Sequence, residues 1–176
     1  MASIIAVNEL QHTNGTTAAT IASDGKVTLP QHLLLTQYPH FEANLSSDMT
    51  GFNSDGAHGA GVAFNNTLYN IGNHFKTSGT DIGLFVVPFD GIYYLDAATI
   101  TPNTMAQSWF TLNNARMPRS DFVMGTSVNR VSNKMIKQFS AGDKIGFHPY
   151  RSGATNLTIS SNTNHTWFRG GLLQAL

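Results

Sequence analysis

Histidine is the residue type in this chain best suited to chemistry, because a neutral imidazole binds zinc or iron and acts as a general base near neutral pH. The seven histidines stand singly, at positions 12, 32, 40, 58, 74, 148 and 165, without the spacings typical of metal-binding pairs. No Gly-x-Ser-x-Gly segment supplies a serine nucleophile. A trimer axis could still gather three copies of one histidine, and His58 and His74 are the candidates. We otherwise predict no enzyme activity and no cofactor.

Two other kinds of site find little support. Calcium needs clustered oxygen ligands, whereas Asp48, Asp55 and Asp81 are dispersed and are of a type that commonly forms turns. The glycines within residues 56–61 resemble a nucleotide-binding loop only loosely, because neither a lysine nor a helical pattern follows them. We therefore expect neither a calcium site nor a phosphate site.

The loop at residues 116–121 is locally basic. Its Arg116 and Arg119 form either a solvated turn or an anion site. Tyr150 is an aromatic residue next to another loop and could stack on the face of a sugar. These three residues are the candidates for ligand-binding loops.

The composition excludes several classes of partner. Only 11% of the 176 residues are charged, against roughly 25% in a typical domain, and ten basic residues balance ten acidic ones. This balance predicts no binding to nucleic acid or anionic lipid. The absence of cysteine excludes disulfides and thiolate chemistry. Residues 1–7 lack a basic flank and are too short for a signal peptide or membrane span, so we expect synthesis in the cytoplasm without secretion or membrane insertion.

The elements that would position these residues are strands. From Phe41 onward, turn signals recur every eight to twelve residues, the rhythm of a β-sandwich or barrel. Residues 49–60 have several glycine or serine breakers and no period, and they form the longest expected loop. The predicted strands cover residues 41–45, 61–64, 68–71, 84–87, 92–100, 108–112, 127–131, 134–139, 144–150, 157–161 and 167–173.

Residues 84–87 and 92–95 form the clearest hairpin-like signal, since a Pro-Phe-Asp-Gly segment separates two β-rich runs. In the second run, Tyr93 and Leu95 alternate with Ile92 and Tyr94, so both faces are largely apolar. A strand of this kind is covered on both sides. One cover is the core of a sandwich, and in so short a chain we expect a neighbouring subunit to be the other.

The N-terminal segment resembles parts of bacteriophage tail-fibre and other appendage proteins. Residues 9–18, with Asn-Gly-Thr-Thr-Ala, and residues 20–30, with Asp-Gly-Lys-Val, carry the resemblance, and a generic β-hairpin arm is the alternative. Short strands are expected at residues 7–10, 17–21 and 26–29. We interpret residues 1–31 as a β-arm for virion attachment or as a trimer stem, and residues 32–40 as a linker.

Residues 41–176 resemble the globular domain of the complement-q family, the jelly roll shared with tumour-necrosis-factor-like trimers. The central match is Phe-x-x-Pro-x-x-Gly-x-Tyr, which begins at Phe85. Leu95 departs from the family, which usually carries another aromatic residue there, and the collagen-like stalk is missing. The five matching segments are residues 62–75, 85–95, 109–114, 139–147 and 168–173.

The resemblance implies an all-β, ten-stranded jelly-roll sandwich that forms homotrimers, with its two chain ends close together at the base. It also implies a set of aromatic and aliphatic residues that pack in the core or between subunits. These residues are Phe64, Phe85, Tyr93, Tyr94, Leu95, Phe147 and Phe168.

The expected function is that of a bacteriophage virion structural protein. In this hypothesis a trimeric fibre or spike attaches to other virion proteins through its N-terminal arm and displays its jelly-roll head to a host-surface glycan or protein. Two alternatives remain. One is a capsid decoration or cement protein with a purely structural role, and the other is a free complement-q-like lectin or adhesin.

Overall fold

The computed structural model of the protein describes two compact units, Met1–Thr36 and Gln37–Leu176, which are treated separately below. The described residues are 9–11, 17–24, 27–28, 38–54, 61–120, 122–153 and 156–176.

The first unit contains a small antiparallel sheet. Strand β1 (Glu9–Gln11) pairs with β2 (Thr17–Ile21), which pairs in turn with β3 (Val27–Thr28). The three short strands expected from the sequence are therefore present. Most of the predicted linker, residues 32–37, lies outside the described residues.

The second unit is all β apart from one short 3-10 turn, η1 (Ile71–Asn73). Its described part contains ten strands, which confirms the predicted fold class. They are β4 (His40–Asn44), β5 (Met49–Phe52), β6 (Asn66–Asn70), β7 (Phe85–Val86), β8 (Gly91–Leu112), β9 (Ala115–Arg116), β10 (Phe122–Phe139), β11 (Lys144–Tyr150), β12 (Leu157–Ile159) and β13 (Trp167–Ala175).

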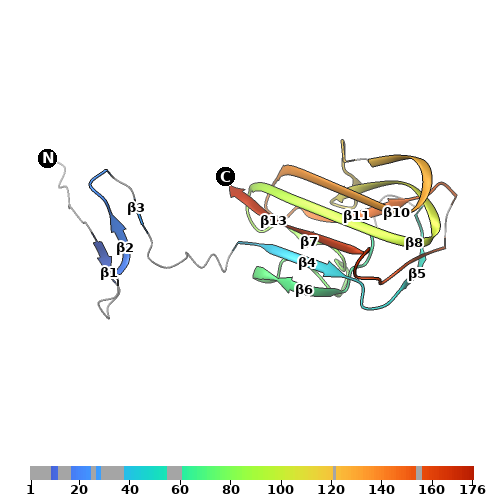
Figure 1. The fold of residues 1–176 in the computed structure, drawn as a ribbon, viewed down its shortest axis with the longest axis horizontal. Helices are drawn as coiled ribbons and strands as arrows, with labels where there is room; N and C mark the ends of the chain where they lie inside the picture. Colours follow the sequence, from blue (N-terminus) through green and yellow to red (C-terminus); the bar gives the residue numbers. More distant parts are fainter. Residues whose placement is uncertain are drawn as a thin grey trace. The chain divides into compact units, whose positions relative to one another are not determined.

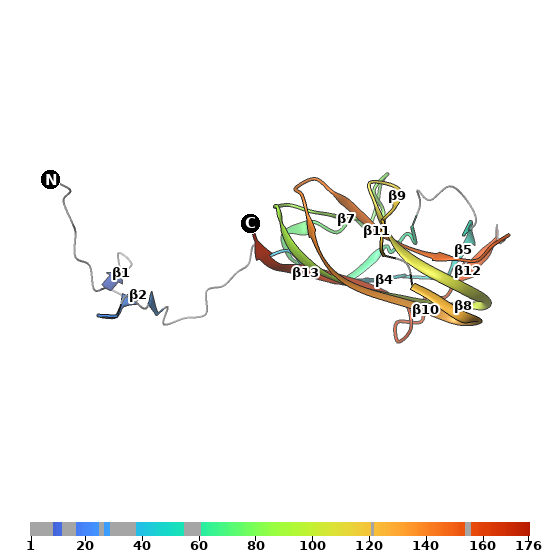
Figure 2. The same cartoon turned by 90° about the horizontal axis from the view of Figure 1, so that it is seen from above.

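Eight of these strands form one sheet that folds over on itself into a sandwich (Figures 1 and 2), and β5 and β12 pair in a separate two-stranded sheet. The order along the sheet is β6-β4-β13-β8-β11-β7, and β10 and β9 also pair with β8. The first part of the long strand β8 pairs with β13, and its last part pairs with β11. Strands β8 and β10 thus run through both layers. The fold-over is measurable, since the ring of Phe85 in β7 lies 4.8 Å from that of Phe41 in β4, although these strands are far apart in the sheet order.

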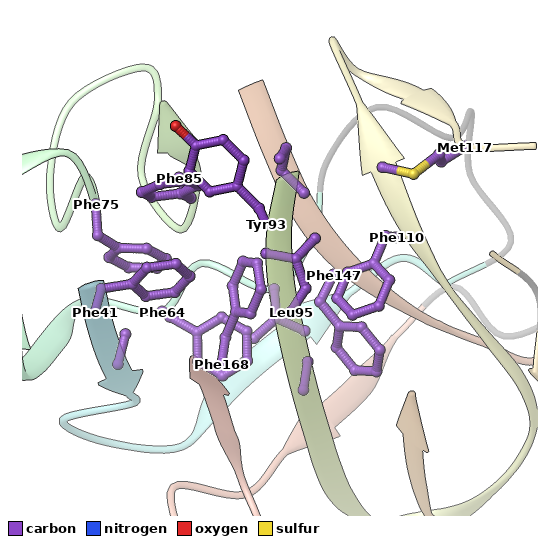
Figure 3. Packing of buried hydrophobic residues seen from close by; sticks show 14 of the residues in the cluster. Phe41, Phe64, Phe75, Phe85, Tyr93, Leu95, Phe110, Met117, Phe147 and Phe168 are labelled. Carbon is purple, nitrogen blue, oxygen red and sulfur yellow. The ribbon is translucent and has the colours of Figure 1, made fainter. Parts of the chain in front are cut away.

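Aromatic side chains fill the space between the layers (Figure 3). Phe168 of β13 contacts the rings of Phe41, Phe64, Phe75 and Phe110 at centroid distances between 4.9 and 6.0 Å. Burial of such large apolar surfaces supplies most of the free energy that favours folding. Six of the residues expected in the core or at subunit contacts are fully buried here: Phe64, Phe85, Tyr93, Leu95, Phe147 and Phe168.

The predicted hairpin at residues 84–95 is wrong. Strand β7 pairs with β11, whereas the start of β8 pairs with β10 and β13. The Pro-Phe-Asp-Gly segment is therefore a crossing from one layer to the other. The local residues do mark the end of one strand and the start of the next, but they do not specify which strands pair.

Other predicted boundaries also differ. The expected loop at residues 49–60 begins with strand β5, which pairs with β12, a segment more than a hundred residues later in the chain. Residues 61–64, expected as a strand, are irregular. The strands predicted at 92–100 and 108–112 are continuous in β8, and those at 127–131 and 134–139 are continuous in β10. The two long strands pair with each other on both sides of their midpoints, with register irregularities between Val123 and Arg130.

Candidate functional site

One layer of the sandwich consists of β6, β4, β13, the first part of β8 and the part of β10 that pairs with it. The side of this layer that faces away from the core is called the outer face. Its centre is the second set of β8 side chains, Ile92, Tyr94, Asp96 and Ala98, which alternate with the buried Tyr93, Leu95 and Ala97. Large apolar side chains around it remain exposed. They are Ile136 at 65%, Leu173 at 53% and Tyr69 at 45%.

A row of alternating charges crosses the outer face. In strand register Lys134 of β10 lies opposite Asp96 of β8, Asp96 lies opposite Arg169 of β13, and Arg169 lies opposite Glu42 of β4. Opposite charges that face each other across neighbouring strands stabilise a sheet. Asp96 Oδ2 lies 2.8 Å from Arg169 Nη2 and 3.8 Å from Lys134 Nζ.

Asp96 is the unusual member of this row because its carboxylate is fully buried. Its Oδ2 accepts hydrogen bonds from Arg169 Nε at 3.0 Å, Arg169 Nη2 at 2.8 Å and the Tyr94 hydroxyl at 3.1 Å. Its Oδ1 is buried and has no hydrogen-bond partner among the described residues. A buried acceptor left unsatisfied costs about 1–3 kcal/mol.

The Asp96 carboxylate contributes to a raised pKa in two neighbours, Arg169 and Tyr94. Its hydrogen bond raises the pKa of Arg169. Burial raises the pKa of Tyr94, and the nearby negative charge of Asp96 raises it further. Arg169 and Tyr94 also border a hollow of about 170 Å³, whose floor includes Gly170 and Gly171. The outer face is thus a partly apolar surface with a fixed charge pattern and a shallow depression.

A second cluster forms around Trp109 in the other layer. The Trp109 ring stacks on His148 with centroids 4.9 Å apart and an interplanar angle of 7°, and the Arg116 guanidinium lies 4.4 Å above the same indole. The Tyr150 ring lies 5.0 Å from Trp109. Trp109 and His148 are both buried, so these two rings are not available to stack on a sugar, whereas Tyr150 is half-buried.

The second unit is similar in sequence and in fold to known proteins. The model of the C1q domain family matches residues 41–173, most of the chain. The chain belongs to the C1q domain family. The globular domain of a zebrafish complement 1qA protein has a similar fold at 18% identity, covering 78% of this chain and 99% of that one with a TM-score of 0.51. Murine APRIL aligns at 12% identity over 77% and 99% of the two chains with a TM-score of 0.54. The search of curated proteins found no match.

The family assignment confirms the jelly-roll interpretation of residues 41–176. C1q domains and their relatives are generally binding modules without enzyme activity, and they typically form trimers. Among the described residues of this C1q domain, no helix has the length and apolar character needed to cross a membrane.

The predicted ligand-loop residues do not form one site. Arg116 and Tyr150 meet around Trp109, whereas Arg119 is exposed in the turn after β9, with a positive φ of 61°. The Trp109–His148 stack was missed because strand pairing, which places residue 148 opposite residue 109, is not visible in the sequence.

The structure describes one of the two candidate metal ligands, His74. His58 lies outside the described residues. His74 is half-buried, and its burial, together with the nearby Lys76, lowers its pKa. In the described ranges no three His, Asp or Glu side chains come together in a way that could hold a metal.

Tyr94 lies on the outer face and not in the core. Asp96 and Arg169 were not among the site residues predicted from the sequence. The available signal was Asp96 itself, since a lone carboxylate in a strand with two apolar faces needs a partner.

Proposed function

We propose that this protein is a homotrimeric binding module on a bacteriophage particle, with the N-terminal arm attached to other virion proteins and the C1q domain displayed to a host-surface glycan or protein. In this proposal the protein is located in the virion and has no enzyme activity. The C1q fold supports the binding role, and the outer face supports the assembly.

The exposed apolar side chains of the outer face are the observation that carries the trimer. Ile136, Leu173 and Tyr69 all lie on this face, around the buried Asp96 carboxylate. A second copy of the chain packed there would cover this apolar surface. The two-sided apolar pattern of β8 independently favours such a cover.

The virion role is the finer part of the proposal. It is supported by the resemblance of residues 9–18 and 20–30 to segments of phage appendage proteins and by the small β-sheet that this region forms. On a particle, three sites per trimer and many trimers would act together, so each single contact could be weak.

Light scattering on the purified full chain tests the assembly. We expect a mass of three times 19.0 kDa. Asp96→Ala should weaken the trimer, because it removes the charge to which Arg169 is paired. A monomeric wild-type protein would refute the trimer, and a trimer that neither associates with phage particles nor binds host cells would refute the virion role.

A further inference from the structure

One pocket of the C1q domain combines a carboxylate and several neutral polar side chains with the apolar residues Ile100 and Pro102. It has a volume of about 340 Å³, within the range of small-molecule sites. The loop after β4, the middles of β8 and β10, β12 and the loop after β12 form its walls. The residues used below are Asp48, Asn129, Thr158, Ser160, Asn162 and Ile100.

Asp48 provides a charged acceptor in this pocket. Its Oδ1 accepts hydrogen bonds from the Ser161 backbone N–H at 2.7 Å and from the Ser161 hydroxyl at 2.8 Å. These bonds lower the pKa of Asp48, so the carboxylate is ionised at neutral pH. Both bonds use one oxygen, and Oδ2 accepts none from the described residues. The second oxygen is therefore available to a ligand hydroxyl.

The remaining wall is held in place by hydrogen bonds from its backbone N–H groups to a carbonyl and to side-chain oxygens. The Ser160 N–H donates to the Ile100 carbonyl at 2.9 Å, and the Asn162 N–H donates to Ser160 Oγ at 3.3 Å. Asn162 Oδ1 accepts from the Asn164 N–H at 3.0 Å, which leaves its amide NH₂ as a donor for the pocket. A site held in this way loses little conformational entropy when it binds a ligand.

The chemistry of this wall selects a class of ligand. A carboxylate, two side-chain amides and several hydroxyls match a molecule whose groups both donate and accept hydrogen bonds, as sugar hydroxyls do. The described lining contains no lysine or arginine, so an anionic ligand would find no counter-charge. A single carboxylate is also too few for a calcium ion.

Strand register places this pocket at the end of the sandwich opposite the points where the chain enters β4 and leaves β13. His40, where the chain enters β4, pairs with Gly171, and Ala175 pairs with Gly91 at the start of β8. Ile100 lies nine residues further along β8 than Gly91, about 30 Å in an extended strand. In a protein attached through its N-terminal arm, this end would be the exposed one.

From these observations we propose that the pocket around Asp48 binds a neutral saccharide. This inference rests on the proposed function and names its ligand class and its site. The Asp48 carboxylate and the Asn162 amide hold vicinal hydroxyls, and the apolar side chain of Ile100 contacts the C–H face of the ring.

Saturation-transfer NMR on the full chain tests this proposal. The probes are the methyl glycosides of galactose, glucose, mannose and N-acetylglucosamine, with the methyl glycoside of sialic acid as the charged comparator. Asp48→Asn keeps an acceptor for Ser161 but removes the charge, and Thr158→Val removes one hydroxyl at constant shape. Asp90→Asn is the matched control, because Asp90 likewise accepts a backbone N–H, that of Ala141 at 2.7 Å, at the opposite end of β8.

We expect at least one neutral glycoside to bind, about tenfold more weakly to Asp48→Asn and severalfold more weakly to Thr158→Val, with no change in Asp90→Asn. The proposal is overturned if no neutral glycoside binds, if both pocket variants bind as the wild type does, or if the sialoside is preferred. If Asp48→Asn failed to fold, as judged by its melting temperature, Thr158→Val would decide alone.

The same variants separate the two proposals. A wild-type trimer that binds host cells, together with Asp48→Asn and Thr158→Val proteins that bind them equally well, would refute the pocket and leave the proposed function intact. Saccharide binding in the pocket by a protein that is monomeric and absent from phage particles would refute the proposed function and support the pocket.

Discussion

Replacing Arg169 by methionine tests the energetics of the charge row on the outer face. The substitution removes the two N–H donors that lie 2.8 and 3.0 Å from Asp96 Oδ2, while methionine keeps much of the apolar stem. The Asp96 carboxylate would then remain fully buried with only the Tyr94 hydroxyl as a close donor and Lys134 at 3.8 Å.

The expected loss of unfolding free energy depends on how far the Arg169–Asp96 pair is buried. A hydrogen bond to a charged group contributes about 1.5–3 kcal/mol, but the Arg169 side chain is 41% exposed and water can replace part of what is lost. We therefore expect Arg169→Met to lower the free energy of unfolding by about 2–3 kcal/mol. For a domain of this size, this corresponds to a fall of about 4–12 °C in melting temperature.

The chain offers a matched control in Lys144. Its Nζ lies 2.9 Å from Asp81 Oδ1, but both side chains are partly exposed, at 40% and 31%. Such surface pairs contribute at most about 1 kcal/mol, so Lys144→Met should have a small effect. Unfolding in urea at one fixed protein concentration, followed by tryptophan fluorescence and with the mass of each variant checked, measures both.

A double-mutant cycle with Asp96→Ala completes the test. Since removal of Asp96 also removes the unpaired charge, the double variant should lose less stability than the sum of the two single variants, by about 1–2 kcal/mol. Equal losses in Arg169→Met and Lys144→Met, or additive single losses, would refute the reasoning.

Three further predictions concern the core, a tight turn and pH. Phe168→Ala should cost about 3–5 kcal/mol of unfolding free energy in urea, because its ring is fully buried among four others. Gly79 and Gly83 both have φ near +78°. A Cβ added to Gly83 would lie 2.3 Å from the Val62 carbonyl oxygen, whereas a Cβ added to Gly79 would have no heavy atom within 4 Å among those compared. Thermal melts should therefore show a loss of about 1–2 kcal/mol for Gly79→Ala and roughly 3 kcal/mol or more for Gly83→Ala; equal losses would contradict this. The lowered pKa of His74 means that the unfolded chain binds the proton more tightly, so stability should fall as pH drops through 6.5, and His74→Gln should flatten this dependence in a series of urea melts.

Part of the outer face could be predicted from the sequence. The alternation of Tyr93 and Leu95 with Ile92 and Tyr94 indicated a strand covered on both sides, and the structure places Tyr93 and Leu95 in the core. The partner of Asp96 could not be predicted, because Arg169 lies 73 residues away and reaches it only through the pairing of β8 with β13. The same limit applies to the pocket around Asp48, since Asp48 and Ser161 are 113 residues apart.

The sequence by itself determined that the second unit is all β and where most of its strands lie. Alternation and turn residues act over a few neighbours, so they can be read locally. Only the tertiary structure decided that residues 84–87 and 92–95 belong to different layers, that one sheet closes into a sandwich, and which side chains meet on the outer face and in the pocket. These features depend on pairing between distant segments, which is selected by the burial of the whole core and not by any one stretch of chain.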